Sequence, residues 1–142
     1  MQTSPFPPAH NPTCASLETR VISRMISQDK AREIALEWID AWNSHDIDSI
    51  MSHYSDDVVL TSPIAVRLLG DKSGVVIGKE ALRAYFEKGL AAFPDLKFEL
   101  TEVYAGVGSI LVLYRRLNGP VGAEFMAVNS EGRIERVIAH YA

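Results

Sequence analysis

The sequence has 142 residues, the length of one ordinary domain, and 14 basic against 18 acidic residues give it a net charge of -4. The basic residues are scattered, which argues against a nucleic-acid partner, and the single cysteine, Cys14, excludes an internal disulfide and a multi-cysteine zinc site. No apolar run approaches the roughly 20 residues of a membrane span, and the first ten residues lack the pattern of a secretion signal, so we expect a cytoplasmic protein without membrane contact.

The N-terminus is rich in proline. Four prolines within residues 1–14 fix their own backbone angles and disfavour helix at the residue before each of them. We therefore predict a proline-rich tail over residues 1–16 and a single domain over residues 17–142. Met25 is an alternative start, and the sequence leaves open whether the first 24 residues are needed.

Helices are predicted for most of the first two-thirds of the chain. Apolar residues at helical spacing indicate a short helix over residues 17–25 and, after a break at 27–29, a main helix over about 30–43. The same spacing indicates a further helix from 47 to about 54. A last helix is predicted over 79–93, where a proline follows.

One strand interrupts these helices. Residues 57–62 alternate, which places Val58, Leu60 and Ser62 on one face, and Pro63 ends the run. A glycine-rich turn follows at residues 70–74.

After Pro94 the apolar residues change to a period of two. Asn118-Gly119 and Ser130-Glu131-Gly132 are hairpin signals between the later runs. Strands are predicted over residues 96–101, 110–117, 121–128 and 133–141. Helices first and antiparallel strands last indicate an α+β fold, in which helices cover one face of a curled sheet.

Residues 41–57 hold four aspartates and two histidines, which raises the question of a metal or acid–base site. His45 precedes the predicted second helix and Asp56-Asp57 follow it, so these side chains converge poorly. Asp46 is well placed as the helix N-cap, and Asp48 lies in the first turn, where negative charge suits the helix dipole. We therefore predict caps and turns instead of a metal site, with His45 and His53 exposed.

A series of motifs runs in order through residues 30–142. These are Trp42-Asn43-x-His45-Asp46-x-Asp48, Tyr54-x-x-Asp57, Ser62-Pro63, Gly78-Lys79-Glu80-Ala81-Leu82-Arg83-x-Tyr85-Phe86 and Phe93-Pro94-Asp95-Leu96. In them the chain resembles the nuclear transport factor 2-like superfamily, and most closely its SnoaL-like, polyketide-cyclase-type branch.

The resemblance implies a cone-shaped roll. Three or four N-terminal helices would pack on a strongly curved antiparallel sheet and enclose an apolar pocket. It further implies a small apolar ligand, no cofactor, and a homodimer formed through the outer sheet face. The superfamily includes isomerases, cyclases, dehydratases and members without catalysis, so the fold alone does not define an activity.

Two catalytic positions of the ketosteroid isomerases in this superfamily are changed in the chain. The resemblance maps their aspartate base, which precedes a proline, to Ser62, and a serine has no usable basicity near neutral pH without an activating base. Their oxyanion tyrosine maps to Trp38, whose indole can only donate a hydrogen bond. Steroid isomerisation by that mechanism is therefore not expected.

The third position maps to Glu124, counted back from the Gly132 hairpin with a register uncertainty of one residue. If Glu124 faces the cavity beside Leu113, Met126 and Tyr141, desolvation raises its pKa, and the neutral acid could protonate a carbonyl. SnoaL-like cyclases are thought to use one acid in this way.

The alternative places Glu124 on the outer face or in a pair with Arg115 or Arg116, since parity on a bulged strand is fragile. By the same parity Tyr114 and Arg116 lie opposite Leu113, on a dimer surface. His140 and Tyr141 fall on opposite faces of their strand.

Two hypotheses follow. The first is a cofactor-independent cyclase, isomerase or dehydratase that binds a small apolar carbonyl compound, with Glu124 as general acid and with Ser62 and Trp38 orienting polar groups. The second is a non-catalytic ligand-binding or dimerising module. The residues expected to shape the cavity are Trp42, Tyr54, Leu60, Leu113, Met126 and Tyr141.

Overall fold

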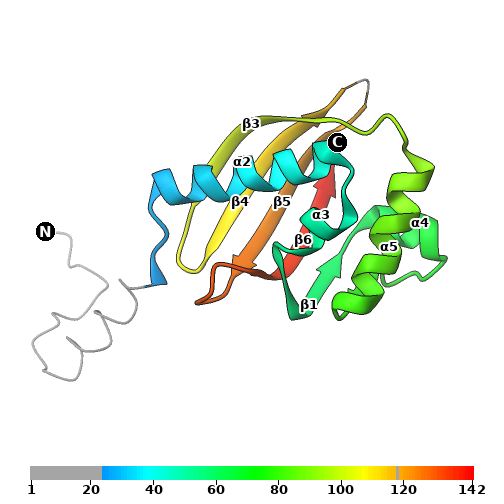
Figure 1. The fold of residues 1–142 in the computed structure, drawn as a ribbon, viewed down its shortest axis with the longest axis horizontal. Helices are drawn as coiled ribbons and strands as arrows, with labels where there is room; N and C mark the ends of the chain where they lie inside the picture. The colour runs from blue at the N-terminus through cyan, green and yellow to red at the C-terminus, as the bar shows by residue number, and fades with distance from the viewer. Residues whose placement is uncertain (1–23, 118) are drawn as a thin grey trace, which may run out of the picture.

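A computed structural model describes residues 24–117 and 119–142 (Figure 1). The predicted tail and nearly all of the predicted helix over 17–25 lie outside these residues. The elements are α2 (Gln28–Ser44), α3 (Ile47–Met51), β1 (Tyr54–Thr61), α4 (Pro63–Leu69), β2 (Val75–Ile77), α5 (Lys79–Ala92), β3 (Phe98–Ala105), β4 (Ser109–Arg116), β5 (Val121–Val128) and β6 (Ile134–Tyr141).

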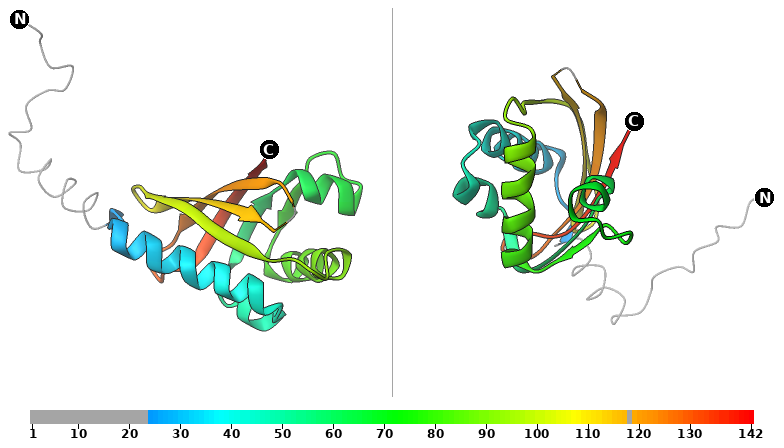
Figure 2. Two further views of the ribbon diagram at one scale, coloured as in Figure 1. Left: turned by 90° about the horizontal axis from the view of Figure 1, so that it is seen from above. Right: turned by 90° about the vertical axis from the view of Figure 1, so that its right-hand side faces the viewer.

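The strands form one curved, unclosed sheet in the order β2-β1-β6-β5-β4-β3. Strands β3 to β6 are the predicted antiparallel meander, whereas β1 runs parallel to β6, so the sheet is mixed. Helices α2 and α5 lie on the same side of the sheet, against β3 and β1 respectively (Figure 2). The predicted α+β class, with helices packed on a curved sheet, is confirmed.

Helix α2 lies across one face of the sheet (Figure 1). It begins where the Ser27 side chain accepts a hydrogen bond from the Lys30 N–H, and it ends at His45, which adopts a left-handed conformation with φ 58°. Its buried side is Ala31, Ile34, Ala35, Trp38, Ile39, Ala41 and Trp42. None of the helices in the described residues combines the length and hydropathy needed to span a bilayer.

The aspartates at positions 46 and 48, in the acidic stretch 41–57, have structural roles. Asp46 caps α3 by accepting a hydrogen bond from the Asp48 N–H, as predicted. Asp48 pairs with Arg83 of α5 at 2.8 Å, so it also ties two helices together. The prediction that both histidines are exposed is wrong, because both are half-buried. His45 donates from Nε2 to the Leu96 carbonyl oxygen at 2.6 Å.

Two boundaries differ from those predicted. The second helix stops at Met51, and Tyr54 begins strand β1, because a tyrosine at i+7 satisfies a helical stripe and a buried strand position equally well. Beyond β1, Ser62 is the N-cap of an additional helix, α4, at a position where a strand end was expected. Pro63 takes the first helical position, where a backbone N–H would have no partner within the helix, so the lack of one in proline costs nothing.

The face predicted for β4 is reversed. Val112 and Tyr114 are fully buried, whereas Leu113 is half-buried on the outer side. Tyr114 pairs with Gly122 across the ladder, and Val112 pairs with Glu124, so Tyr114 and Glu124 share the inner face. The alternation along β4 does not show which side faces inward, because Leu111 and Leu113 make the outer face as apolar as the inner one.

We predict that Gly122→Ala destabilises the fold. A Cβ at Gly122 would lie 2.5 Å from Cζ of Tyr114, so the ring must move. Overpacking of this kind costs about 1–3 kcal/mol, measurable by urea denaturation. Gly89→Ala is the matched control, because its Cβ meets nothing within 4 Å and alanine favours helix α5. Equal or greater stability of the Gly122 variant would contradict the packing described here.

Candidate functional site

A cavity of about 70 Å³ lies between the inner face of the sheet and the helices. Aromatic and aliphatic side chains make most of its wall, together with one carboxyl group and several hydroxyls. It is lined by Trp38, Trp42, Tyr54, Leu60, Ser62, Ile64, Tyr85, Phe86, Gly89, Phe93, Leu96, Phe98, Tyr114, Glu124, Ala139 and Tyr141.

Glu124 is the carboxyl group of this wall. It sits in the middle of β5 between Val112 and Ala139, and only 7% of its surface is exposed. The Tyr114 hydroxyl donates to its Oε1 at 3.1 Å. Burial raises the pKa of Glu124 to about 7, although hydrogen bonds from Tyr114 and Tyr141 act in the opposite direction. The carboxyl therefore changes its protonation state close to neutral pH.

Tyrosines surround this carboxyl. Burial and then the negative charge of Glu124 raise the pKa of Tyr114 and of Tyr141. Burial also raises the pKa of Tyr85, while a hydrogen bond with Ser62 opposes that shift. These phenols stay protonated at neutral pH and serve as hydrogen-bond donors.

The two tryptophans of α2 differ in their hydrogen bonds. Trp38 is 2% exposed, stacks on Phe98 with 5.6 Å between ring centroids, and donates its N–H to the Tyr54 hydroxyl at 2.9 Å. Trp42 contacts Phe86 edge-on with 4.7 Å between centroids. Burial raises the pKa of Tyr54, and the Trp42 indole lies close enough to that hydroxyl to oppose the shift, yet its buried Nε1 makes no hydrogen bond of good distance and angle in the described residues.

The structure brings together most of the side chains proposed for the site. Glu124 faces the cavity, so it lies neither on the outer face nor in a pair with an arginine. Arg115 instead pairs with Glu99 at 2.8 Å. Two of the expected wall residues are elsewhere: Leu113 lies on the outer face, and Met126 is fully buried in the core without lining the cavity. Those that do line it are Trp38, Trp42, Tyr54, Leu60, Ser62, Glu124 and Tyr141.

Two hydroxyls of the wall were not predicted there: Tyr85 was not proposed for the site, and Tyr114 was wrongly expected on the outer face. Tyr85 follows Leu82 by three positions on α5 and is buried beside it, and Tyr114 continues the buried alternation of Ile110 and Val112 on β4. A signal for Tyr114 existed in Gly122, because a glycine opposite a large aromatic residue in a hairpin indicates that the ring lies across it.

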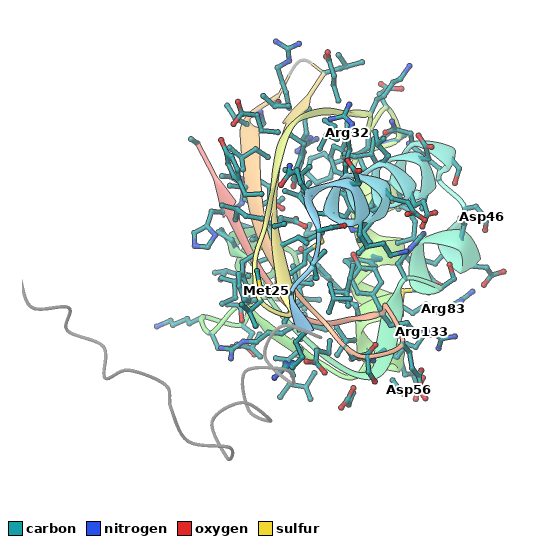
Figure 3. All side chains as sticks on the ribbon, turned by 90° about the vertical axis from the view of Figure 1, so that its left-hand side faces the viewer. Met25, Arg32, Asp46, Asp56, Arg83 and Arg133 are labelled. Carbon is teal, nitrogen blue, oxygen red and sulfur yellow. The ribbon has the colours of Figure 1, made fainter. Side chains whose placement is uncertain are left out.

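No metal-ligand cluster forms in residues 24–117 and 119–142: no three His, Cys, Asp or Glu side chains are placed to share an ion. Asp46 and Asp56 project at separate places on the outside of the molecule (Figure 3).

The sequence from residue 35 to residue 142 matches the model of the SnoaL-like domain family. The chain belongs to this family. This family has the nuclear transport factor 2-like fold, in agreement with the helices and curved sheet described above. No curated protein matches the sequence.

Solved structures of SnoaL-like and related proteins resemble the chain. A SnoaL-like protein of unknown function from Burkholderia thailandensis E264 is 41% identical, with a TM-score of 0.79 over 83% of this chain and 98% of the other. A putative ketosteroid isomerase from Kribbella flavida is 19% identical, with a TM-score of 0.64 over 81% and 79%. SalBIII, an epoxide hydrolase/cyclase-like enzyme in pyran ring formation in salinomycin, is 20% identical, with a TM-score of 0.65 over 82% and 93%.

We predict that Glu124 makes stability pH-dependent. The unfolded chain loses this proton near pH 4.5, whereas the folded chain keeps it to about pH 7. The free energy of unfolding should therefore fall as pH rises through this window, by about 3 kcal/mol, and level off above it.

Glu124→Gln should remove that fall, as measured by urea denaturation between about pH 5 and about pH 8. Glu131→Gln, in an exposed hairpin, is the control and should keep the pH dependence of the wild type. A variant at Glu124 with an unchanged slope would show that the carboxyl is not the titrating group.

Proposed function

We propose that the chain binds a small apolar carbonyl compound in this cavity and that Glu124 is the general acid of a cofactor-independent reaction. The observation that carries the proposal is the Glu124 carboxyl itself, buried in an aromatic wall and fixed by the Tyr114 hydroxyl. A group whose pKa lies near the working pH is the most effective proton donor. The isomerase and cyclase names of the structural neighbours support the same reaction class.

The chemistry needs only one carboxyl group. Neutral Glu124 gives its proton to the carbonyl oxygen of the ligand, and the carboxylate that remains takes a proton from the adjacent carbon, so the ligand passes from ketone to enol with no net gain or loss of protons. Tyr114 and Tyr141 donate to the carboxylate while it is charged. This enol is the reactive form for isomerisation or for ring closure onto a second group.

Ser62 does not replace the missing aspartate as a base. Its hydroxyl accepts from the Ile64 N–H and caps α4, so its first role is structural. Trp38 likewise donates its single N–H to Tyr54, which leaves no donor for a ligand oxygen. The proposal therefore assigns proton transfer to Glu124 alone.

We predict that Glu124→Gln abolishes proton exchange without abolishing binding. Glutamine keeps the shape and the contact with Tyr114 but has no proton to give. Deuterium uptake at the carbon beside the carbonyl of small cyclic ketones, followed by NMR, measures the step without knowledge of the natural substrate. The rate should fall as pH rises through about 7, where the acid is lost.

Glu131→Gln serves again as control and should exchange at the wild-type rate. Exchange that is undiminished in the Glu124 variant would refute the catalytic role. Ketones that bind the wild type without exchange would indicate the non-catalytic binding module.

We also propose that the outer sheet face forms a homodimer. An apolar row crosses it through ladder partners: Tyr104 pairs with Leu111, Leu111 with Phe125, and Phe125 with Ile138. Tyr104 is 50% and Leu111 is 37% exposed in the single chain. Burial of this row against a second copy would remove it from water.

Leu111→Glu should dissociate that dimer. Light scattering should give about twice the chain mass of 15.7 kDa for the wild type and the single-chain mass for the variant. Leu36→Glu, on a residue of α2 that is 39% exposed, is the matched control and should remain dimeric. A wild type that scatters as a monomer would exclude the interface.

A further inference from the structure

We propose that the Trp42 N–H and the Tyr54 hydroxyl form a donor pair that binds a second oxygen of the ligand. The substrate class is then an apolar compound with two oxygen functions: a carbonyl at Glu124 and a second carbonyl, ether or hydroxyl oxygen at the donor pair. This inference rests on the proposed function and narrows its substrate.

The first observation is that the Trp42 indole lies beside the Tyr54 hydroxyl but makes no well-aligned hydrogen bond in the described residues. Its Nε1 is buried, the residue is 8% exposed, and it lines the same cavity as Glu124. The great majority of buried polar groups in proteins are hydrogen-bonded. Because an indole N–H can only donate, the partner that Trp42 lacks among the described residues is an acceptor. A ligand oxygen in the cavity supplies one.

The Trp42 ring is held by its neighbours. It packs edge-on against Phe86, with 4.7 Å between centroids at 76°, and against Phe98 with 5.9 Å between centroids. Trp38 lies beside it, one helical turn earlier on α2, with 6.3 Å between the rings. Aromatic contacts on three sides fix the direction of the N–H before any ligand arrives, which is what a binding donor requires.

The second observation is the direction of the hydrogen bond at Tyr54. The Tyr54 oxygen accepts from Trp38, so its own hydrogen is free to be donated to another acceptor. Accepting one hydrogen bond strengthens a hydroxyl as donor in the next. Tyr54 is also anchored through its backbone, because the Lys79 ammonium donates to its carbonyl oxygen at 3.1 Å.

Tyr54 and Trp42 therefore make a neutral donor end of the cavity, and Glu124 with its tyrosines makes the acid end. The two ends share one space, because Trp42, Tyr54 and Glu124 line the same cavity. An acceptor oxygen suits the donor end, since both of its groups give hydrogen and neither is an ion. A ligand that spans both ends carries two oxygens.

Two-dimensional NMR of nitrogen-15-labelled protein tests this directly. The chain has two tryptophans, so the indole region holds two peaks, and Trp42→Phe identifies the one that belongs to Trp42. The probes are 1,4-cyclohexanedione, with two oxygens, and cyclohexanone, with one. On titration with the dione, we expect the Trp42 indole proton to move downfield while that of Trp38, already bonded to Tyr54, stays in place.

Affinities provide the second measurement. Trp42→Phe keeps an aromatic ring but removes the N–H, so it should weaken dione binding about two- to tenfold more than cyclohexanone binding. Phe93→Leu, which changes the cavity wall without removing a hydrogen bond, is the control and should weaken both probes alike. The wild-type titration remains decisive even if a variant folds poorly.

The outcomes separate the two proposals. Dione binding that leaves the Trp42 proton unmoved would overturn the donor pair and leave the role of Glu124 intact. A Trp42 shift without any proton exchange would support the donor pair and overturn the catalytic proposal. Failure of both probes to bind the wild type would overturn the ligand site, and the donor pair with it.

Discussion

The hydrogen bond between the Tyr114 hydroxyl and the buried Glu124 carboxyl ties the chemistry of the cavity to one pairing of the strands. A carboxyl group in an aromatic wall is costly unless its oxygens are satisfied, and the tyrosine satisfies one of them only if β4 and β5 pair in a single register. In that register Tyr114 lies across Gly122, where no side chain obstructs the ring. A shift by one residue would place Glu124 outside and an apolar residue in its place.

Much of the fold could be predicted from the sequence. The change from helical spacing to alternation near Pro94 and the hairpin signal at residues 118–119 indicate helices before a meander, and the family motifs supply the curvature and the packing of helices on one face. Alternation was ambiguous where both strand faces are apolar. On β4, Leu111 and Leu113 outside match Ile110 and Val112 inside, so the sequence alone does not distinguish the faces.

The site was harder to predict than the fold, for a similar reason. Glu124 could be located by counting from a hairpin, because a single acid in an apolar strand is conspicuous. The tyrosines could not, since a tyrosine in an amphipathic pattern reads equally as core, surface or cavity wall. Tyr54 shows the limit most clearly: it satisfies a helical stripe, yet it begins β1, and nothing in the sequence indicates that its hydroxyl accepts a hydrogen bond from Trp38.

The parallel pairing of β1 with β6 bears on how the cavity is assembled during folding. The meander strands are neighbours in sequence and can pair locally, but Thr61 meets Ile138 only after a loop of more than seventy residues has closed. Such distant contacts cost chain entropy before they contribute stability, so they form late. We therefore expect the wall that holds Glu124 and Tyr114 to form with the hairpins, and Tyr54 and Ser62 to join it later. The barrier to refolding should lie in that closing step.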